Sequence, residues 1–314
     1  QAKINSAWNA TAKEYVGNIQ DKGGVADGNS SPSNVTLDMS VGYKLAARIV
    51  APSNKLEESG SPVVLDVASA GGEPAITIAK LLPDATIHAT DFAPAMMDLI
   101  KQRAAEAGVS NVSASVADGE ALTGFGDESV DAVTCTFGMI FMPNWQQAVK
   151  EFSRVLRSNG VVAVTLWEKH EDCIFDRLHR VLDTLVPGYE GVIDPMSLGD
   201  DKGSPVADEM KAAGLHDVSV SEFSVPLVLA PEARVGDIWE YYTASSPLGQ
   251  SLSTLEAKGR TNVRQEARDI FESHMEEDWA EGRTPLGLPK NAEDGPRVIY
   301  TRALLVVGRK CGGG

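Results

Sequence analysis

Short apolar runs alternate with amphipathic stretches through residues 63–167. The first run, Val63 to Val67, is broken only by Asp66 and leads directly into a turn of small residues, a pattern typical of a buried strand. Similar runs predict four more strands, at 86–90, 112–116, 130–137 and 161–167. Between them, apolar residues recur at helical spacing in segments that begin near residues 74, 94 and 144. Five strands joined by short crossovers predict a parallel, doubly wound α/β sheet.

The rhythm changes after Trp167. The pattern predicts a helix over 173–186, a loop over 187–206 that is rich in Gly, Pro and Asp, a strand over 218–229, polar helices over 234–283 and a last strand over 298–308. Because the helices form a long insertion before the last strand, we expect them to act as a lid on the sheet rather than as a second domain.

Composition and charge narrow the possible partners. A chain of 314 residues with 43% hydrophobic residues is expected to fold as one domain. Its net charge of −16 would repel a phosphate backbone, so we expect no nucleic-acid partner. The three cysteines, Cys135, Cys173 and Cys311, lie far apart and lack the spacing of a zinc site, so no metal is expected.

No apolar run approaches the roughly 20 residues of a membrane helix. The first residues also lack the layout of a secretory signal, so we expect a soluble, cytoplasmic protein without a membrane span. Because residue 1 is Gln and not Met, a removed organellar targeting segment remains open. The oligomeric state is unknown from the sequence.

The small residues Ala68 to Gly72 follow the first strand and precede a helix. Such a turn lets the backbone approach a ligand, whose polar groups meet the N-terminus of the helix. A nicotinamide fingerprint, GxGxxG, would place Ala68, Ala70 and Glu73 where glycines belong, and the Glu73 carboxylate would repel a pyrophosphate. The turn therefore favours a cofactor without phosphates.

Four segments in register resemble the class I S-adenosylmethionine-dependent methyltransferases, especially small-molecule enzymes similar to the ubiquinone/menaquinone C-methyltransferases. VVLDVASAGGEPAITIAKLL resembles motif I, HATDFAPAMM the second-strand motif, SVADGEAL the adenine-contacting motif, and the segment from VDAVTCTFG to VTLWE the region from the fourth strand to the fifth. The resemblance is continuous over about 60–168 and weaker through RALLVVGRK and the N-terminal WNATAKEY.

The resemblance implies a Rossmann-like, mostly parallel seven-stranded sheet with helices on both faces and an antiparallel last strand. We expect a single domain over 1–314, with N-terminal cap helices over 1–58, a cofactor-binding core over 59–168, a substrate and lid region over 169–297 that includes the sixth strand, and the last strand over 298–310.

The resemblance also implies roles for particular residues toward S-adenosylmethionine, whose product is S-adenosylhomocysteine. Asp91 would accept hydrogen bonds from both ribose hydroxyls, since the two oxygens of a carboxylate can accept two parallel hydrogen bonds from a diol. Asp66 and the backbone of the turn would hold the methionine end of the cofactor. A purely structural role is the alternative for each residue. Ala70 departs from the family, which more often has glycine there. The expected cofactor-binding residues are Asp66, Ala68, Ser69, Ala70, Gly71, Gly72, Asp91, Phe92, Asp118, Gly119, Phe137 and Gly138.

The residues that would handle the methyl acceptor are harder to place. Ligands of open α/β sheets lie beyond the carboxyl ends of the strands, which directs attention to Glu168, His170 and Asp172 after the fifth strand. His170 is the candidate base, although it also fits an ordinary surface position in the charged run WEKHED. Candidate acceptor contacts are Trp8, Tyr15, Met139, Trp239 and Tyr242, of which the last two also fit the core of the lid.

We therefore expect an enzyme that transfers a methyl group from S-adenosylmethionine to a small-molecule acceptor, at a carbon, nitrogen, oxygen or sulfur atom that the sequence does not identify. Two alternatives stay open. One is a nicotinamide-dependent oxidoreductase on the same layered fold, and the other is an S-adenosylmethionine-binding protein without catalytic activity.

Overall fold

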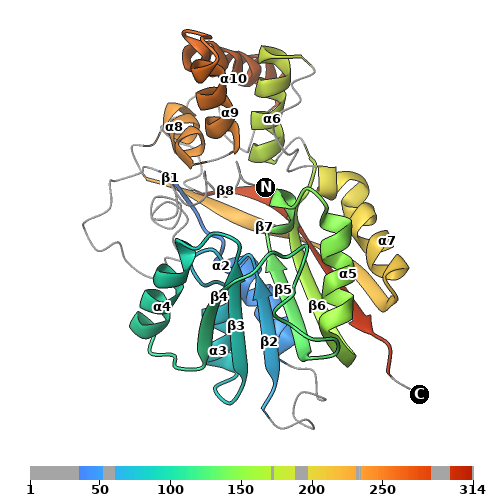
Figure 1. Cartoon of the computed structure of the whole chain (residues 1–314). Coiled ribbons are helices and arrows are strands. Elements are labelled where there is room, and N and C mark those ends of the chain that lie inside the picture. Colours follow the sequence, from blue (N-terminus) through green and yellow to red (C-terminus); the bar gives the residue numbers. More distant parts are fainter. Residues whose placement is uncertain are drawn as a thin grey trace.

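In this computed structural model one mixed sheet of eight strands organises the protein, in the order β1-β7-β8-β6-β5-β2-β3-β4. The structure describes residues 35–51, 61–170, 173–187, 197–230, 233, 235–245, 247–283 and 298–312. Figure 1 shows helices packed on both faces of the sheet and a group of helices beyond one end of it. The expected doubly wound α/β fold is confirmed.

The parallel half of the sheet comprises β2 (Val63–Val67), β3 (Thr86–Asp91), β4 (Val112–Val116), β5 (Val130–Thr136) and β6 (Leu156–Trp167). These are the five strands expected from the apolar runs. Val64 of β2 packs in one core cluster, whereas Leu65 and Val67 pack in the cluster on the opposite face. The buried run is therefore continuous because both faces of the sheet are covered.

The antiparallel half is built from β7 (Leu215–Leu229) and β8 (Val298–Lys310), and β8 lies between β6 and β7. The expected antiparallel last strand is confirmed. A short strand, β1 (Val35–Leu37), pairs with β7 and adds an eighth strand to the seven that were expected. Three residues are too short a run for strand periodicity to stand out in the sequence.

Helices α2 (Ser40–Val50), α3 (Ala75–Leu81) and α4 (Met96–Glu106) cover one face of the parallel strands. On the other face, α5 (Trp145–Val155) packs on β6, and α7 (Ser204–Ala212) packs beside α5 on β7 and β8. Helix α7 and the 3₁₀ turn η2 (Ser197–Gly203) replace part of the loop predicted over 187–206. That prediction was wrong from 197 onward, because Gly203 starts a helix that buries Val206 and Met210.

Helices α6 (Ile174–Leu185), α8 (Val235–Ser245), α9 (Pro247–Ala257) and α10 (Val263–Ala280) form a group that we call the helical cap. Figure 1 shows it beyond the sheet, next to the ends of β1 and β8. An ion pair between Arg177 and Asp278 joins α6 to α10. The cap matches the expected helical insertion in sequence, while its role as a lid stays a prediction.

Of the N-terminal cap helices expected over 1–58, the structure describes α2, whereas residues 1–34 and 52–60 lie outside the described residues. Within the part of the chain that the structure describes, no helix is both long and apolar enough to cross a membrane.

Candidate active site

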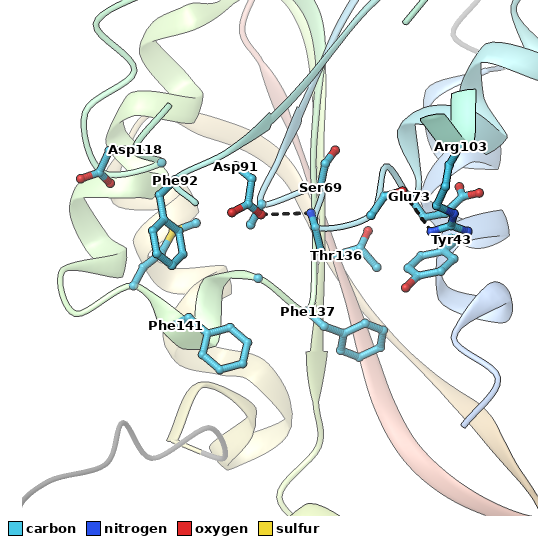
Figure 2. A pocket seen from close by; sticks show the side chains of 16 residues that line it. Tyr43, Ser69, Glu73, Asp91, Phe92, Arg103, Asp118, Thr136, Phe137 and Phe141 are labelled. Carbon is cyan, nitrogen blue, oxygen red and sulfur yellow. Dashed lines mark hydrogen bonds between the residues drawn. The ribbon is translucent and has the colours of Figure 1, made fainter. Parts of the chain in front are cut away.

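A pocket of about 750 Å³, its solvent-open mouth included, lies at the carboxyl ends of β2, β3 and β5 (Figure 2). This is a size typical of small-molecule sites and the edge where ligands of open α/β sheets bind. Of the residues expected to bind the cofactor, all but Asp66 and Gly72 line it. The full lining is Tyr43, Ala68, Ser69, Ala70, Gly71, Glu73, Asp91, Phe92, Arg103, Asp118, Gly119, Thr136, Phe137, Gly138, Phe141 and Met142.

The turn after β2 has an unusual backbone. Ala68 and Ala70 adopt left-handed conformations, with φ angles of 59° and 46°. A side chain at such an angle costs roughly 1–2 kcal/mol relative to the right-handed region. Hydrogen bonds hold the turn in this shape, since Ser69 N donates to Thr90 O at 2.8 Å and Gly72 N donates to Ser69 O at 2.7 Å. The departure noted at Ala70 therefore extends to Ala68.

Asp66 lies beneath this turn and is fully buried. Its carboxylate accepts hydrogen bonds from the Ser69 hydroxyl, from Thr134 Oγ1 at 2.7 Å and from Ala75 N at 3.3 Å. Burial raises the pKa of Asp66 to about 7, and these donors partly offset the increase. The carboxylate thus ties the turn to β5 and to the first turn of α3 instead of facing the pocket.

Asp91, the last residue of β3, presents its carboxylate to the pocket. Its Oδ2 accepts a hydrogen bond from Ala70 N at 3.0 Å, and its Oδ1 accepts one from Ala93 N at 2.9 Å. Burial raises the pKa of Asp91 to about 6, with these two amides acting against the rise. Each carboxylate oxygen accepts more than one hydrogen bond, so the amides orient the group while leaving it acceptor capacity toward a ligand.

Phe92 and Asp118 lie at one end of the pocket (Figure 2), and Gly119, the next residue after Asp118, also lines it. Asp118 Oδ1 accepts a hydrogen bond from Glu120 N at 2.9 Å, which fixes the carboxylate above the end of β4. A Cβ on Gly119 would approach Met142 Cε to 2.7 Å and Val67 Cγ1 to 2.9 Å. Any larger residue there would force one of these two side chains to move, so glycine leaves room at this end of the pocket.

The turn after β5, which contains Phe137 and Gly138, lines another side of the pocket. Phe137 has a left-handed backbone, with a φ of 56°, and its N–H donates to Thr165 O and Thr165 Oγ1, both at 3.1 Å. Its ring stacks on Trp167 at 4.1 Å between centroids. A Cβ on Gly138 would meet Ala68 Cβ at 2.4 Å. The turns after β2 and β5 therefore fit together only because residue 138 has no side chain.

Six lining residues were missed by the sequence reasoning: Tyr43, Glu73, Arg103, Thr136, Phe141 and Met142. Glu73 and Thr136 directly adjoin predicted site residues in the chain, so strand-end position was an available signal. Arg103 lies in α4, 32 residues after Gly71 in the chain, and its Nη1 donates a hydrogen bond to Gly71 O at 3.0 Å. No local pattern indicates that α4 turns this side chain toward the pocket.

The predicted base, His170, does not line the pocket. Its Nε2 lies 3.4 Å from Nη1 of Arg302, whose Nε donates to the buried Glu168 at 2.7 Å. Because His170 lies outside the pocket lining, the proposed reaction below does not use it. Asp172 lies outside the described residues.

Of the predicted acceptor contacts, Met139, Trp239 and Tyr242 do not line the pocket. Met139 is fully buried, Trp239 packs on Phe271 of α10 at 5.5 Å between ring centroids, and Tyr242 packs on Phe175 of α6 at 5.1 Å. Trp8 and Tyr15 lie outside the described residues. The structural alternative for Trp239 and Tyr242, a place in the core of the helical cap, matches what the structure shows.

The fold is of the doubly wound α/β class, and its pocket presents the Asp91 carboxylate at the end of β3. Residues 64–160 match the family described as methyltransferase domain. Over 172 residues, the chain is 34% identical to a demethylmenaquinone methyltransferase of Deinococcus radiodurans, which covers 53% of this chain and 70% of that protein.

The chain is also 31% identical over 128 residues to the ubiquinone/menaquinone biosynthesis C-methyltransferase UbiE of Geotalea daltonii. That match covers 40% of this chain and 54% of the relative, so the chain spans about half the length of that protein. The crystal structure of the YcgJ protein from Bacillus subtilis shares the fold, with a TM-score of 0.58, 19% identity, and coverage of 87% of this chain and 100% of that one.

The chain belongs to the class I S-adenosylmethionine-dependent methyltransferases and resembles their ubiquinone/menaquinone C-methyltransferases. S-adenosylmethionine is therefore its cofactor and methyl donor. The pocket agrees with such a ligand, because the buried carboxylates of Glu73 and Asp91 in its lining would oppose a pyrophosphate. The oxidoreductase alternative gains no support.

Proposed function

We propose that the protein methylates a small, largely apolar molecule by in-line displacement inside the pocket at the ends of β2, β3 and β5. The observation that carries the proposal is the Asp91 carboxylate, which is oriented by two backbone amides and faces the pocket. In this arrangement the Asp91 carboxylate accepts hydrogen bonds from the two ribose hydroxyls. Phe92, Asp118 and Gly119 accommodate the adenine.

When bound, the cofactor supplies an electrophilic methyl group on a sulfonium. The protein's contribution is to align the acceptor with that methyl group and to exclude water. Alignment alone contributes effective molarities on the order of 10⁵ M or more, and a dry pocket favours a displacement in which charge is dispersed. Among the described lining residues, the carboxylates lie where the cofactor would bind, so the proposed reaction relies on positioning and not on a general base.

The acceptor is proposed to be apolar because Tyr43, Phe137 and Phe141 contribute aromatic rings to the lining. Aromatic rings bind a hydrophobic body and leave few polar groups to match. The names of the relatives from Deinococcus radiodurans and Geotalea daltonii refer to quinone precursors, so quinols belong in any set of acceptors to be tested, together with phenols, amines and thiols.

The test begins with binding of isotope-labelled S-adenosylmethionine to the wild-type protein and to Asp91→Ala. We expect the variant to lose at least about a hundredfold in affinity, since two charge-assisted hydrogen bonds disappear. Asp98→Ala, which removes an exposed carboxylate on α4, is the matched control and should bind normally. Unchanged affinity in Asp91→Ala would contradict the assignment.

The acceptor is identified by mass spectrometry of a metabolite extract incubated with the protein and the cofactor. We expect at least one compound to gain a single methyl group with wild-type protein and not with Asp91→Ala. Cofactor binding without methylation of any extract component or of the acceptor panel would favour the alternative of a catalytically inactive binding protein.

A further inference from the structure

The loop between β4 and β5, residues 117–129, carries two of the residues that line the pocket, Asp118 and Gly119. Figure 2 shows Asp118 at one end of the pocket, beside Phe92. Within this loop the structure has turns and one isolated bridge, between Asp118 and Ala121, in place of a helix or a longer strand. The position of the Asp118 carboxylate therefore depends on whatever holds the loop from outside.

The loop is fixed at two points, one on each side of Asp118. Before it, Ala117 N donates a hydrogen bond to Asp91 O at 3.0 Å. After it, Leu122 is fully buried, and its N–H donates to Glu151 Oε2 of helix α5 at 2.8 Å. Because only four residues separate Ala117 from Leu122, the anchor on α5 limits where the Asp118 carboxylate can lie.

A second residue of α5, Arg154, completes this anchor and uses all five of its N–H donors. Its Nε and Nη2 donate to the two carboxylate oxygens of Glu151, each at 2.8 Å. Its Nη1 and Nη2 also donate to the backbone of the loop, at Phe125 O (3.0 Å) and Leu122 O (3.1 Å). The remaining donor, on Nη1, bonds to Asp127 Oδ1 at 2.8 Å.

The geometry of this anchor requires an arginine. A planar guanidinium binds a carboxylate through two parallel hydrogen bonds and still reaches other acceptors, whereas the ammonium of a lysine is a single point charge. The hydrogen bond from Arg154 also lowers the pKa of the Glu151 carboxyl, which favours the ionised form that accepts from both Arg154 and Leu122. Arg154 does not itself line the pocket, so it can affect a ligand only through the loop.

We propose that Arg154 and Glu151 are positioning residues for recognition of the base: by holding the loop over 117–129, they keep the Asp118 carboxylate where it accepts a hydrogen bond from the exocyclic amine of the adenine. This inference rests on the proposed function, which places the adenine beside Phe92 and Asp118. A purely structural role of the anchor predicts lower stability and an unchanged preference for the base. A positioning role predicts that the preference itself is lost.

Two ligands that differ in one group of the base test this by calorimetric titration. S-adenosylhomocysteine carries the exocyclic amine, and its purine analogue carries a hydrogen atom in place of that amine. The wild-type protein should bind S-adenosylhomocysteine at least about tenfold more tightly, because the analogue leaves the Asp118 carboxylate without this donor. Arg154→Gln and Glu151→Gln should each weaken S-adenosylhomocysteine at least about fivefold and leave the analogue within about twofold of the wild type.

Two further variants separate positioning from other effects. Arg154→Lys keeps the positive charge but lacks the planar guanidinium, so it should behave like Arg154→Gln. In an Asp118→Ala background, Arg154→Gln should not change the preference further, because the carboxylate through which it acts is gone. The matched control is Arg157→Gln, which removes a similarly exposed arginine paired with Asp131 at the amino ends of β5 and β6 and should bind both ligands normally.

Thermal unfolding shows whether each variant is folded at the temperature of the titration, and Glu151→Gln, which keeps the shape of the side chain, carries the test if Arg154→Gln does not fold. Variants that weaken both ligands alike, or neither, would overturn the positioning role, and so would a wild-type preference in Arg154→Lys. Wild-type protein that binds the two ligands equally would overturn it while leaving the proposed function standing. Failure to bind S-adenosylhomocysteine at all would contradict the proposed function itself.

Discussion

The contact between Ala68 and Gly138 makes a quantitative prediction about how the two turns of the pocket fit together. A Cβ added to Gly138 would lie 2.4 Å from Ala68 Cβ, more than 1 Å inside ordinary carbon–carbon contact of about 3.5–4.0 Å. Both atoms belong to backbone turns, so neither can rotate away. We expect Gly138→Ala to lower the free energy of unfolding by about 2–3 kcal/mol, as overpacking typically does.

The replacement Ala68→Gly should be nearly neutral alone. It removes a Cβ from a residue with a φ of 59°, a gain of roughly 1–2 kcal/mol. Against this, it loses a partly buried methyl worth at most about 0.8 kcal/mol and adds flexibility to the unfolded chain worth about 0.4–1 kcal/mol. In the double variant, the nearest remaining atom to the Cβ at 138 is Cys135 Sγ, at 3.3 Å, a tight contact that a small shift relieves.

The assay is thermal and urea unfolding of the wild type, both single variants and the double variant. Gly138→Ala should lower the melting temperature by about 3–5 °C, and adding Ala68→Gly should recover most of that loss. The coupling free energy between the two sites is expected to be about 2 kcal/mol. A double variant no more stable than Gly138→Ala would refute the direct contact between the two turns.

Two further predictions concern ionisable groups. Burial raises the pKa of Asp91 to about 6, and the ionised form accepts hydrogen bonds from the ribose diol. The affinity for S-adenosylhomocysteine should therefore be constant above about pH 7 and fall below pH 6 by at most about tenfold per pH unit. Binding titrations from pH 5 to 8 check this, and Asp91→Asn should show no such fall. Replacing Arg302, which is partly exposed and whose Nε lies 2.7 Å from the buried Glu168, by Met should lower the free energy of unfolding by about 1–3 kcal/mol. Adding Glu168→Gln should recover more than half of that loss in urea unfolding, and no loss of stability in Arg302→Met would contradict the idea that Arg302 compensates the buried Glu168 carboxylate.

The sequence by itself determined the parallel half of the sheet and the place of the site. Strands β2, β3, β5 and β6 correspond to short, mostly apolar runs bounded by turns. The hydrophobic pattern that predicts each strand lies within its own few residues. Asp91 and the turn of Ala68 to Gly72 follow such strands directly. The carboxyl ends of neighbouring parallel strands meet at one edge, so their convergence could be predicted without coordinates.

Only the tertiary structure decided which groups face the ligand. Asp66 and Asp91 are both acidic residues at the carboxyl ends of strands. The Asp66 carboxylate is nevertheless enclosed by Ser69, Thr134 and Ala75, whereas the Asp91 carboxylate lines the pocket. Arg103 lies at the site although it belongs to helix α4, and Arg302 of the distant strand β8 contacts His170, the candidate base. These outcomes depend on contacts between residues far apart in the chain, and local spacing carries no information about such contacts because packing alone brings the partners together.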